Sequence, residues 1–117
     1  MKFSIISVIF IIASVFIARS TADALPKCIG KKIKDIRAEP VWNPPATVSK
    51  YSYKGQIVFL FSSNCCDQFN TLYDQSCNYI CAPSGGFTGQ GDGLCTDFDQ
   101  VAKFIKVVFK GRRGSGK

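Results

Sequence analysis

The chain has 117 residues, of which 46% are hydrophobic and 20% are charged, and its formal net charge is +7. This length allows one small domain. The sequence contains six cysteines and no histidine. The lack of histidine excludes Ser-His-Asp and Cys-His catalysis and zinc sites built from histidine.

Residues 1–24 have the three parts of a secretory signal peptide. Lys2 supplies the positive start, residues 3–18 form an apolar run interrupted only by serines, and small residues at Ala22 and Ala24 each fit a cleavage site. The run is shorter than the roughly 20 residues that cross a bilayer. We therefore expect a signal peptide at 1–24, one disulfide-rich domain at 25–110 with no transmembrane segment, and a disordered basic tail at 111–117.

All six cysteines follow this leader, and an even number in a small exported chain indicates a disulfide framework. We expect three bridges among Cys28, Cys65, Cys66, Cys77, Cys81 and Cys95. Pairings that join the adjacent Cys65 and Cys66 are set aside, and the connectivity otherwise stays open. If Cys81 bonds Cys95, closing that loop contributes about 3 kcal/mol in the chain-entropy model. Free thiols or a metal cluster are the alternative.

The first element of the mature chain is predicted to be a short amphipathic helix from Cys28 to Glu39. Ile29, Ile33 and Ile36 recur at helical spacing, while basic residues occupy the other face. Pro40 ends the helix. Trp42, the only tryptophan, is expected to be a lid on the core.

The clearest local signal is a β-hairpin. Residues 48–53 are rich in β-formers, Lys54-Gly55 offers a tight turn, and 56–61 is a β-branched and aromatic run. Residues 57–61 do not alternate between apolar and polar, which indicates a central strand covered on both faces. Residues 78–81 are predicted to form a third strand.

The segment 83–93 carries five glycines, which exclude a helix or a regular strand there. After it, residues 98–109 fit either a helical stripe or a strand, and we favour a short helical turn with Asp97 as its N-cap, followed by a strand. The predicted fold class is α+β: a small disulfide-stapled domain with an N-terminal helix on a three- to four-stranded antiparallel sheet.

Charge is segregated along the mature chain. Residues 27–37 hold five bases and one acid, residues 55–102 hold five acids and no base, and residues 103–117 hold six bases and no acid. The basic ends therefore either lie against the acidic middle or face an anionic partner. Gly111 to Lys117 matches part of a phosphate-binding loop, but we reject the match because no helix follows. Processing at Arg112-Arg113 stays open beside a plain solvated tail.

Three further functions are disfavoured. Asp92, Asp97 and Asp99 lack the spacing of an EF-hand, so turn and cap roles are favoured over a calcium site. No carboxylate pair stands out as hydrolytic machinery. The aromatic residues cluster in expected core strands, and export also argues against a nucleic-acid partner. We expect no enzyme activity, no metal and no cofactor.

Three blocks of the mature chain resemble a known family. They are Glu39 to Pro45; Cys65-Cys66-Asp67 with Leu72-Tyr73-Asp74; and Ile80 to Gly89 running through Gly91-Asp92-Gly93 to Cys95 and Asp97-Phe98. Over about Cys28 to Phe109 the chain resembles small exported proteins, known mainly from Bacteroidota-type bacteria and classed as a domain of unknown function. The resemblance implies an exported, cysteine-bridged single domain and assigns no activity or functional residue. Cys77 stands where that family often has a non-cysteine turn residue.

A weaker likeness is to Kazal-type protease inhibitors, through Tyr73-Asp74, Cys77, Cys81, Gly86, Thr88 and Cys95. The Thr-Tyr-x-Asn stretch of those inhibitors is missing, and the interval from Cys81 to Cys95 is longer than theirs.

These observations favour a secreted, extracellular and monomeric binding module without catalytic function. Loops on a stapled scaffold commonly carry recognition, so the expected contact with an unknown extracellular protein or anionic surface is the loop with Pro83, Ser84, Phe87, Gln90 and Asp92. Two alternatives are a cationic host-defence peptide or toxin acting on membranes, which the net charge of +6 after loss of residues 1–24 suggests, and a secreted protease inhibitor.

Overall fold

The structure is a computed structural model that describes residues 24–65 and 67–112. The expected signal peptide, apart from Ala24, and the tail beyond Arg112 lie outside the described residues. The expectation that Cys65 does not bond Cys66 also involves a residue outside them.

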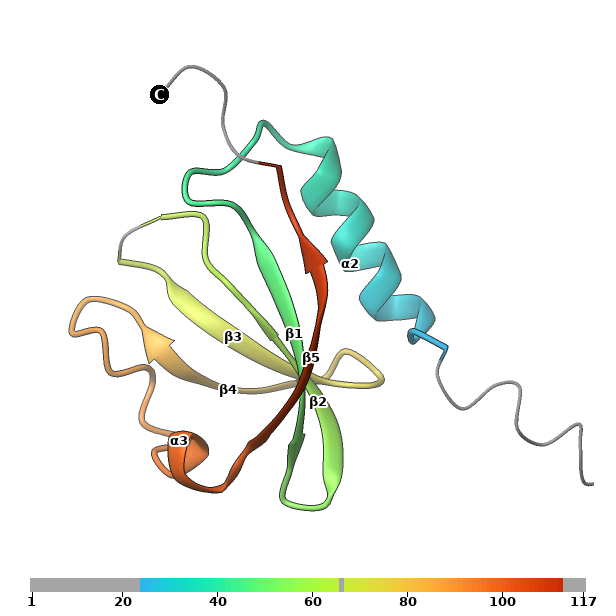
Figure 1. The fold of residues 1–117 in the computed structure, drawn as a ribbon. Helices are drawn as coiled ribbons and strands as arrows, with labels where there is room; N and C mark the ends of the chain where they lie inside the picture. The colour runs from blue at the N-terminus through green and yellow to red at the C-terminus, as the bar shows by residue number, and fades with distance from the viewer. Residues whose placement is uncertain (1–23, 66, 113–117) are drawn as a thin grey trace, which may run out of the picture.

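The described chain forms one long helix, five strands and a short helix. They are α2 (Lys27–Ala38), β1 (Thr47–Tyr53), β2 (Gln56–Phe61), β3 (Phe69–Asp74), β4 (Tyr79–Gly85), α3 (Phe98–Val101) and β5 (Lys103–Lys110). The strands make one antiparallel sheet in the order β4-β3-β2-β1-β5, with α2 beside β5 (Figure 1). The predicted α+β class with a helix on an antiparallel sheet is confirmed. The described sheet has five strands, where three or four were expected, because residues 69–74 form a strand as well.

The predicted hairpin is confirmed as β1 and β2. Its turn residues Lys54 and Gly55 both have positive φ, at 51° and 82°. Two such residues make the type I′ turn, whose twist matches that of the flanking strands. Tyr53 pairs with Gln56 directly beside the turn, so the turn sets the register of the whole hairpin.

Strand β2 lies in the middle of the sheet and is covered on both faces, as predicted. On the α2 side Phe59 is buried with Ile29 and Ile33 of the helix. On the other side Val58 is buried with Phe98 of α3. Because successive strand residues point to opposite faces, one strand supplies two separate cores. The first is Ile29, Ile33, Val48, Phe59 and Phe61, and the second is Tyr53, Val58, Leu72, Cys81, Cys95 and Phe98.

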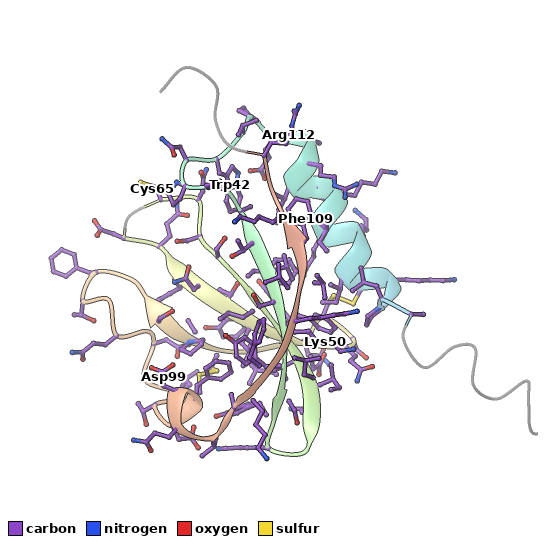
Figure 2. The ribbon with its side chains drawn as sticks, viewed as in Figure 1. Trp42, Lys50, Cys65, Asp99, Phe109 and Arg112 are labelled. Atoms are coloured by element: carbon purple, nitrogen blue, oxygen red, sulfur yellow. A yellow bond between two sulfur atoms is a disulfide. The ribbon has the colours of Figure 1, made fainter. Side chains whose placement is uncertain are left out.

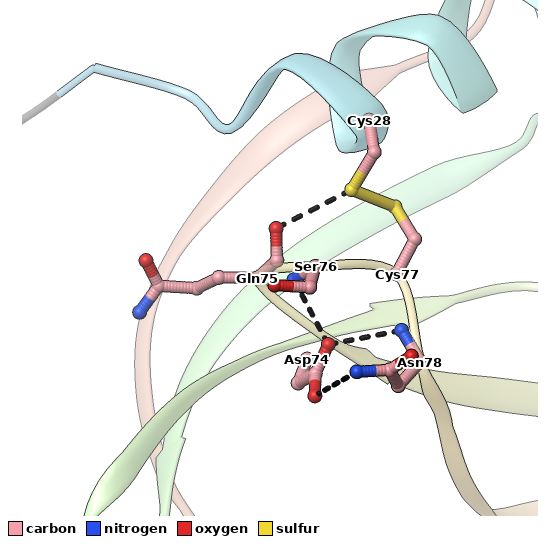
Figure 3. The surroundings of a disulfide bond; sticks show 6 residues. All are labelled: Cys28, Asp74, Gln75, Ser76, Cys77 and Asn78. Carbon is pink, nitrogen blue, oxygen red and sulfur yellow. Dashed lines mark hydrogen bonds between the residues drawn. A yellow bond between two sulfur atoms is a disulfide. The ribbon is translucent and has the colours of Figure 1, made fainter.

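A disulfide between Cys28 and Cys77 joins the start of α2 to the turn between β3 and β4 (Figure 3). Asp74 organises this turn, because its carboxylate accepts hydrogen bonds from the backbone N–H groups of Ser76 and Asn78, both at 2.9 Å. These bonds, with that to the Asn78 backbone the strongest, hold the pKa of Asp74 below its ordinary value. The helix is therefore tied covalently to a turn that is itself well ordered.

The C-terminal segment folds as the favoured alternative: the short helix α3 followed by the strand β5. Asp97 is the N-cap residue of α3, as predicted, but its side chain makes no capping hydrogen bond. Instead, its carboxylate accepts the Tyr53 hydroxyl at 2.7 Å and forms an ion pair with Lys54 Nζ at 3.2 Å. These two partners, which stand at the hairpin end, take the carboxylate away from the helix amides.

The contact among Tyr53, Lys54 and Asp97 also shifts the pKa of each of these three residues. The hydrogen bond from Tyr53 holds the pKa of Asp97 below its ordinary value, with Lys54 contributing in the same direction. Burial raises the pKa of Tyr53, and the bond to Asp97 adds to that rise. The ion pair with Asp97 raises the pKa of Lys54. The network fastens the hairpin end to the start of α3.

Candidate functional site

The five residues predicted to contact a partner do not share one kind of structure. Pro83 and Ser84 lie in β4, which runs to Gly85. The prediction that no regular strand enters residues 83–93 is therefore wrong. Ser84 pairs with Asn70 of β3, and the register shifts between Asn70 and Leu72. An edge strand with such an irregularity accommodates proline, so β4 continues through Pro83.

The rest of the segment is a loop with its own hydrogen bonds. Three backbone bonds fold it onto the sheet: Gly86 N–H to Gln68 O at 3.0 Å, Gly91 N–H to Gly85 O at 2.9 Å, and Asp92 N–H to Ala82 O at 2.9 Å. The disulfide between Cys81 and Cys95 closes the segment, with Cα atoms 6.0 Å apart. Both of these cysteines are buried in the core, so the loop has fixed ends and a fixed path.

Gly91 shows why glycine is needed in this loop. Its φ is 83°, and a Cβ there would lie 2.1 Å from the carbonyl oxygen of Ala82. Real side chains do not approach backbone that closely, and positive φ is strained for L-residues. The packing of Gly91 against β4 therefore depends on the missing side chain.

Asp92 holds the loop from within. One carboxylate oxygen accepts the hydroxyl of Tyr79, and the other accepts the Leu94 N–H at 3.0 Å. The first bond raises the pKa of Tyr79 to about 12 and holds the pKa of Asp92 below its ordinary value. Asp92 thus has the expected turn role, because its carboxylate connects Tyr79 of β4 to the backbone of Leu94 through hydrogen bonds.

Phe87 and Gln90 project from the loop into solvent. Phe87 is 91% exposed, which is the largest value among the apolar side chains described as exposed. The ring of Phe69 lies against the backbone of Gly86, the residue before Phe87, and Phe69 is itself 45% exposed. The tip of the loop therefore presents the aromatic side chain of Phe87 to solvent, and the Phe69 ring of β3 packs under the residue before it.

The sequence did not reveal a second feature, a cavity between the end of α2 and the end of β5. Trp42 is half-buried and lines this cavity. The structure thus places Trp42 in the wall of a cavity, where a lid on the core was expected. A tryptophan between prolines just beyond a helix was the only local sign of it.

Three further observations concern the described residues only. The described residues contain no group of three or more Cys, Asp or Glu side chains placed to hold a metal ion. In the same residues, no helix combines the length and apolarity needed to cross a membrane. None of the cysteines in the described part is free.

Comparison with known proteins gives one result. No curated protein and no solved structure matches the chain. A family model matches residues 34–111, which include β1 to β5, α3 and the last five residues of α2. The chain therefore belongs to the family described as "Domain of unknown function (DUF6970)".

Proposed function

We propose that this protein is a secreted, non-catalytic binding module that contacts an extracellular protein through the tip of its 83–93 loop. The observation that carries the proposal is the 91% exposure of Phe87 on a loop with a defined conformation. An aromatic side chain in water costs free energy that burial in a partner recovers, at about 25 cal/mol per Å² of apolar surface.

Rigidity supports the same proposal. A loop that is already ordered loses little conformational entropy when a partner binds it, so more of the contact energy appears as affinity. Aromatic anchors at the centre of a contact commonly dominate binding. Gln90 and Thr88 are exposed beside Phe87 and supply hydrogen-bonding groups for the rim of such a contact.

Secretion is part of the proposal and follows from the leader pattern of residues 1–24 together with the disulfides, which form in oxidising compartments. An origin among exported proteins of Bacteroidota-type bacteria belongs to the same proposal. The absence of histidine from the chain supports a non-catalytic role. Secretion is tested by the mass of the natural product, which should correspond to a chain that starts at Asp23 or Leu25.

The contact is tested by photo-crosslinking the folded, oxidised protein. A benzoylphenylalanine at position 87 should form an adduct with one protein from extracellular material of the source organism, and excess wild-type protein should compete it away. Excess F87S should not compete, whereas V101S should compete fully, because Val101 is an exposed apolar residue on α3. Both variants should keep the wild-type thermal midpoint. Equal competition by F87S and wild type would overturn the proposal.

The membrane-active alternative has one specific observation in its favour. Strand β5 exposes Phe104, Ile105 and Val107, and three exposed lysines lie on the same strand, at Lys103, Lys106 and Lys110. Apolar and basic side chains together favour contact with anionic lipid surfaces. Leakage from phosphatidylglycerol vesicles that disappears in high salt would support this alternative, and intact vesicles would reject it.

A further inference from the structure

A cavity outside the 83–93 loop has the form of a ligand site. It lies between the C-terminal end of α2, the following segment and the last residues of β5, and its volume is about 400 Å³. Small-molecule sites in proteins usually measure roughly 300–1,000 Å³. Figure 2 shows Trp42, Phe109 and Arg112, which all line this α2–β5 pocket, at the same end of the molecule.

The walls of the α2–β5 pocket are mainly apolar. They are formed by Ile36, Val41, Trp42, Ala46 and Phe109. The indole N–H of Trp42 donates a hydrogen bond to Glu39 Oε1 at 2.9 Å. This bond satisfies the polar edge of the indole, so the ring can serve as an apolar wall.

Positive charge gathers at the same pocket. Arg37, Lys110 and Arg112 all line it, against a single carboxylate, that of Glu39. Among the described residues, none of these three cations forms an ion pair. The Arg37 guanidinium lies 5.2 Å from the centre of the Phe109 ring, so one cation is already placed against an apolar wall.

We propose that the α2–β5 pocket binds a small organic acid with an apolar, aromatic body and one carboxylate. The body would lie against Trp42 and Phe109, and the carboxylate would meet Arg37 and Arg112, because guanidinium groups bind carboxylates through paired hydrogen bonds. A free acid and the C-terminal carboxylate of a peptide that ends in an aromatic residue share this chemistry. The proposal is independent of the role of the 83–93 loop.

The first test compares 2-naphthoate with the neutral 2-naphthamide on the folded, oxidised protein by NMR titration. Trp42 is the only tryptophan, so the protein has a single indole N–H signal, and that signal reports on the pocket directly. We expect naphthoate to shift it saturably and to bind about tenfold more tightly than naphthamide, as for a charge-assisted hydrogen bond.

The second test separates the pocket from general attraction by a basic protein. R37Q/R112Q should weaken naphthoate binding by about tenfold or more. The control K103Q/K106Q removes the same charge from β5 at residues that do not line the pocket, and it should bind naphthoate within about twofold of wild type, since exposed charges at a distance are screened by salt. Equal thermal midpoints would show that both variants fold.

The third test distinguishes the two sources of the acid. A short peptide ending in phenylalanine is compared as the free acid and as the C-terminal amide. Binding of the peptide acid and of naphthoate identifies a general carboxylate pocket, and binding of the peptide acid alone identifies a peptide terminus as the ligand. The proposal is overturned if acids bind no better than amides, if K103Q/K106Q weakens binding as much as R37Q/R112Q, or if neither naphthoate nor the peptide acid moves the indole signal.

Discussion

The bridge between Cys28 and Cys77 should be a main source of stability, because it spans 49 positions. In the chain-entropy model, closing a loop of that length lowers the entropy of the unfolded chain by an amount worth about 4 kcal/mol. The double variant C28A/C77A should therefore lose about 4 kcal/mol in free energy of unfolding, measured by urea denaturation without reductant. It should keep the helical circular-dichroism signal, since the burial of Ile29 and Ile33 still holds α2 on the sheet.

A matched variant shows which state the bridge acts on. I33A removes buried surface from α2 with the bridge intact, and it should cost about 3 kcal/mol through a cavity in the folded state. The urea m-value should separate the two variants, because it follows the surface exposed on unfolding. Removing the bridge lets the unfolded chain expand, so C28A/C77A should raise the m-value while I33A leaves it unchanged. A loss under about 1 kcal/mol, or an unchanged m-value with faster amide exchange confined to α2, would refute the entropic account.

Three further predictions concern the loop and the aspartates. The G91A substitution should lower the free energy of unfolding by about 1–3 kcal/mol. G89A should lower it less, because a Cβ at position 89 would meet open space at a similar φ. Equal thermal midpoints of the two variants would contradict this prediction. The pKa of Asp74 is lowered in the folded state, so its contribution to stability should be lost as the pH falls below the ordinary value of 3.8, and the midpoint of D74N should depend less on pH in acid-unfolding experiments. In an ultraviolet titration one tyrosine, Tyr79, should ionise only near pH 12, and the D92N substitution should return the pKa of Tyr79 toward its ordinary value. Because the folded state holds this proton more tightly than the unfolded state, the free energy of unfolding should fall as the pH rises from about 10 to about 12.

Local signals were sufficient for the hairpin and the helix. Lys54-Gly55 is a turn that needs positive φ at both positions, and the flanking residues have high β-propensity, so both the turn and its register follow from about a dozen neighbouring residues. The isoleucine spacing of α2 is equally local. Strand β3 was missed because Phe69, Asn70 and Thr71 carry little alternation, and their pairing depends on partners in β2 and β4.

The candidate sites differ in the same way: one could be predicted from neighbouring residues, and the other depends on residues that are far apart in the sequence. The exposed tip of the 83–93 loop follows from its glycines and its flanking cysteines. The α2–β5 pocket joins residues near position 40 to residues near position 110, which no local pattern places together. Asp97 was assigned to a helix terminus by a local rule, yet it bonds Tyr53, 44 positions away. The Asp97 carboxylate thus binds Tyr53 and Lys54, which are distant in the sequence, and makes no bond to the nearby backbone amides of α3.

Strand β5 is an edge strand of the sheet that the described residues form, and it exposes Phe104, Ile105 and Val107. Such an edge is a template for stacking chain upon chain into fibrils. Two register irregularities against β1 interrupt its regular spacing, and the lysines at 103, 106 and 110 repel a second copy. The positive charge of this strand thus opposes edge-to-edge pairing of two copies of the domain.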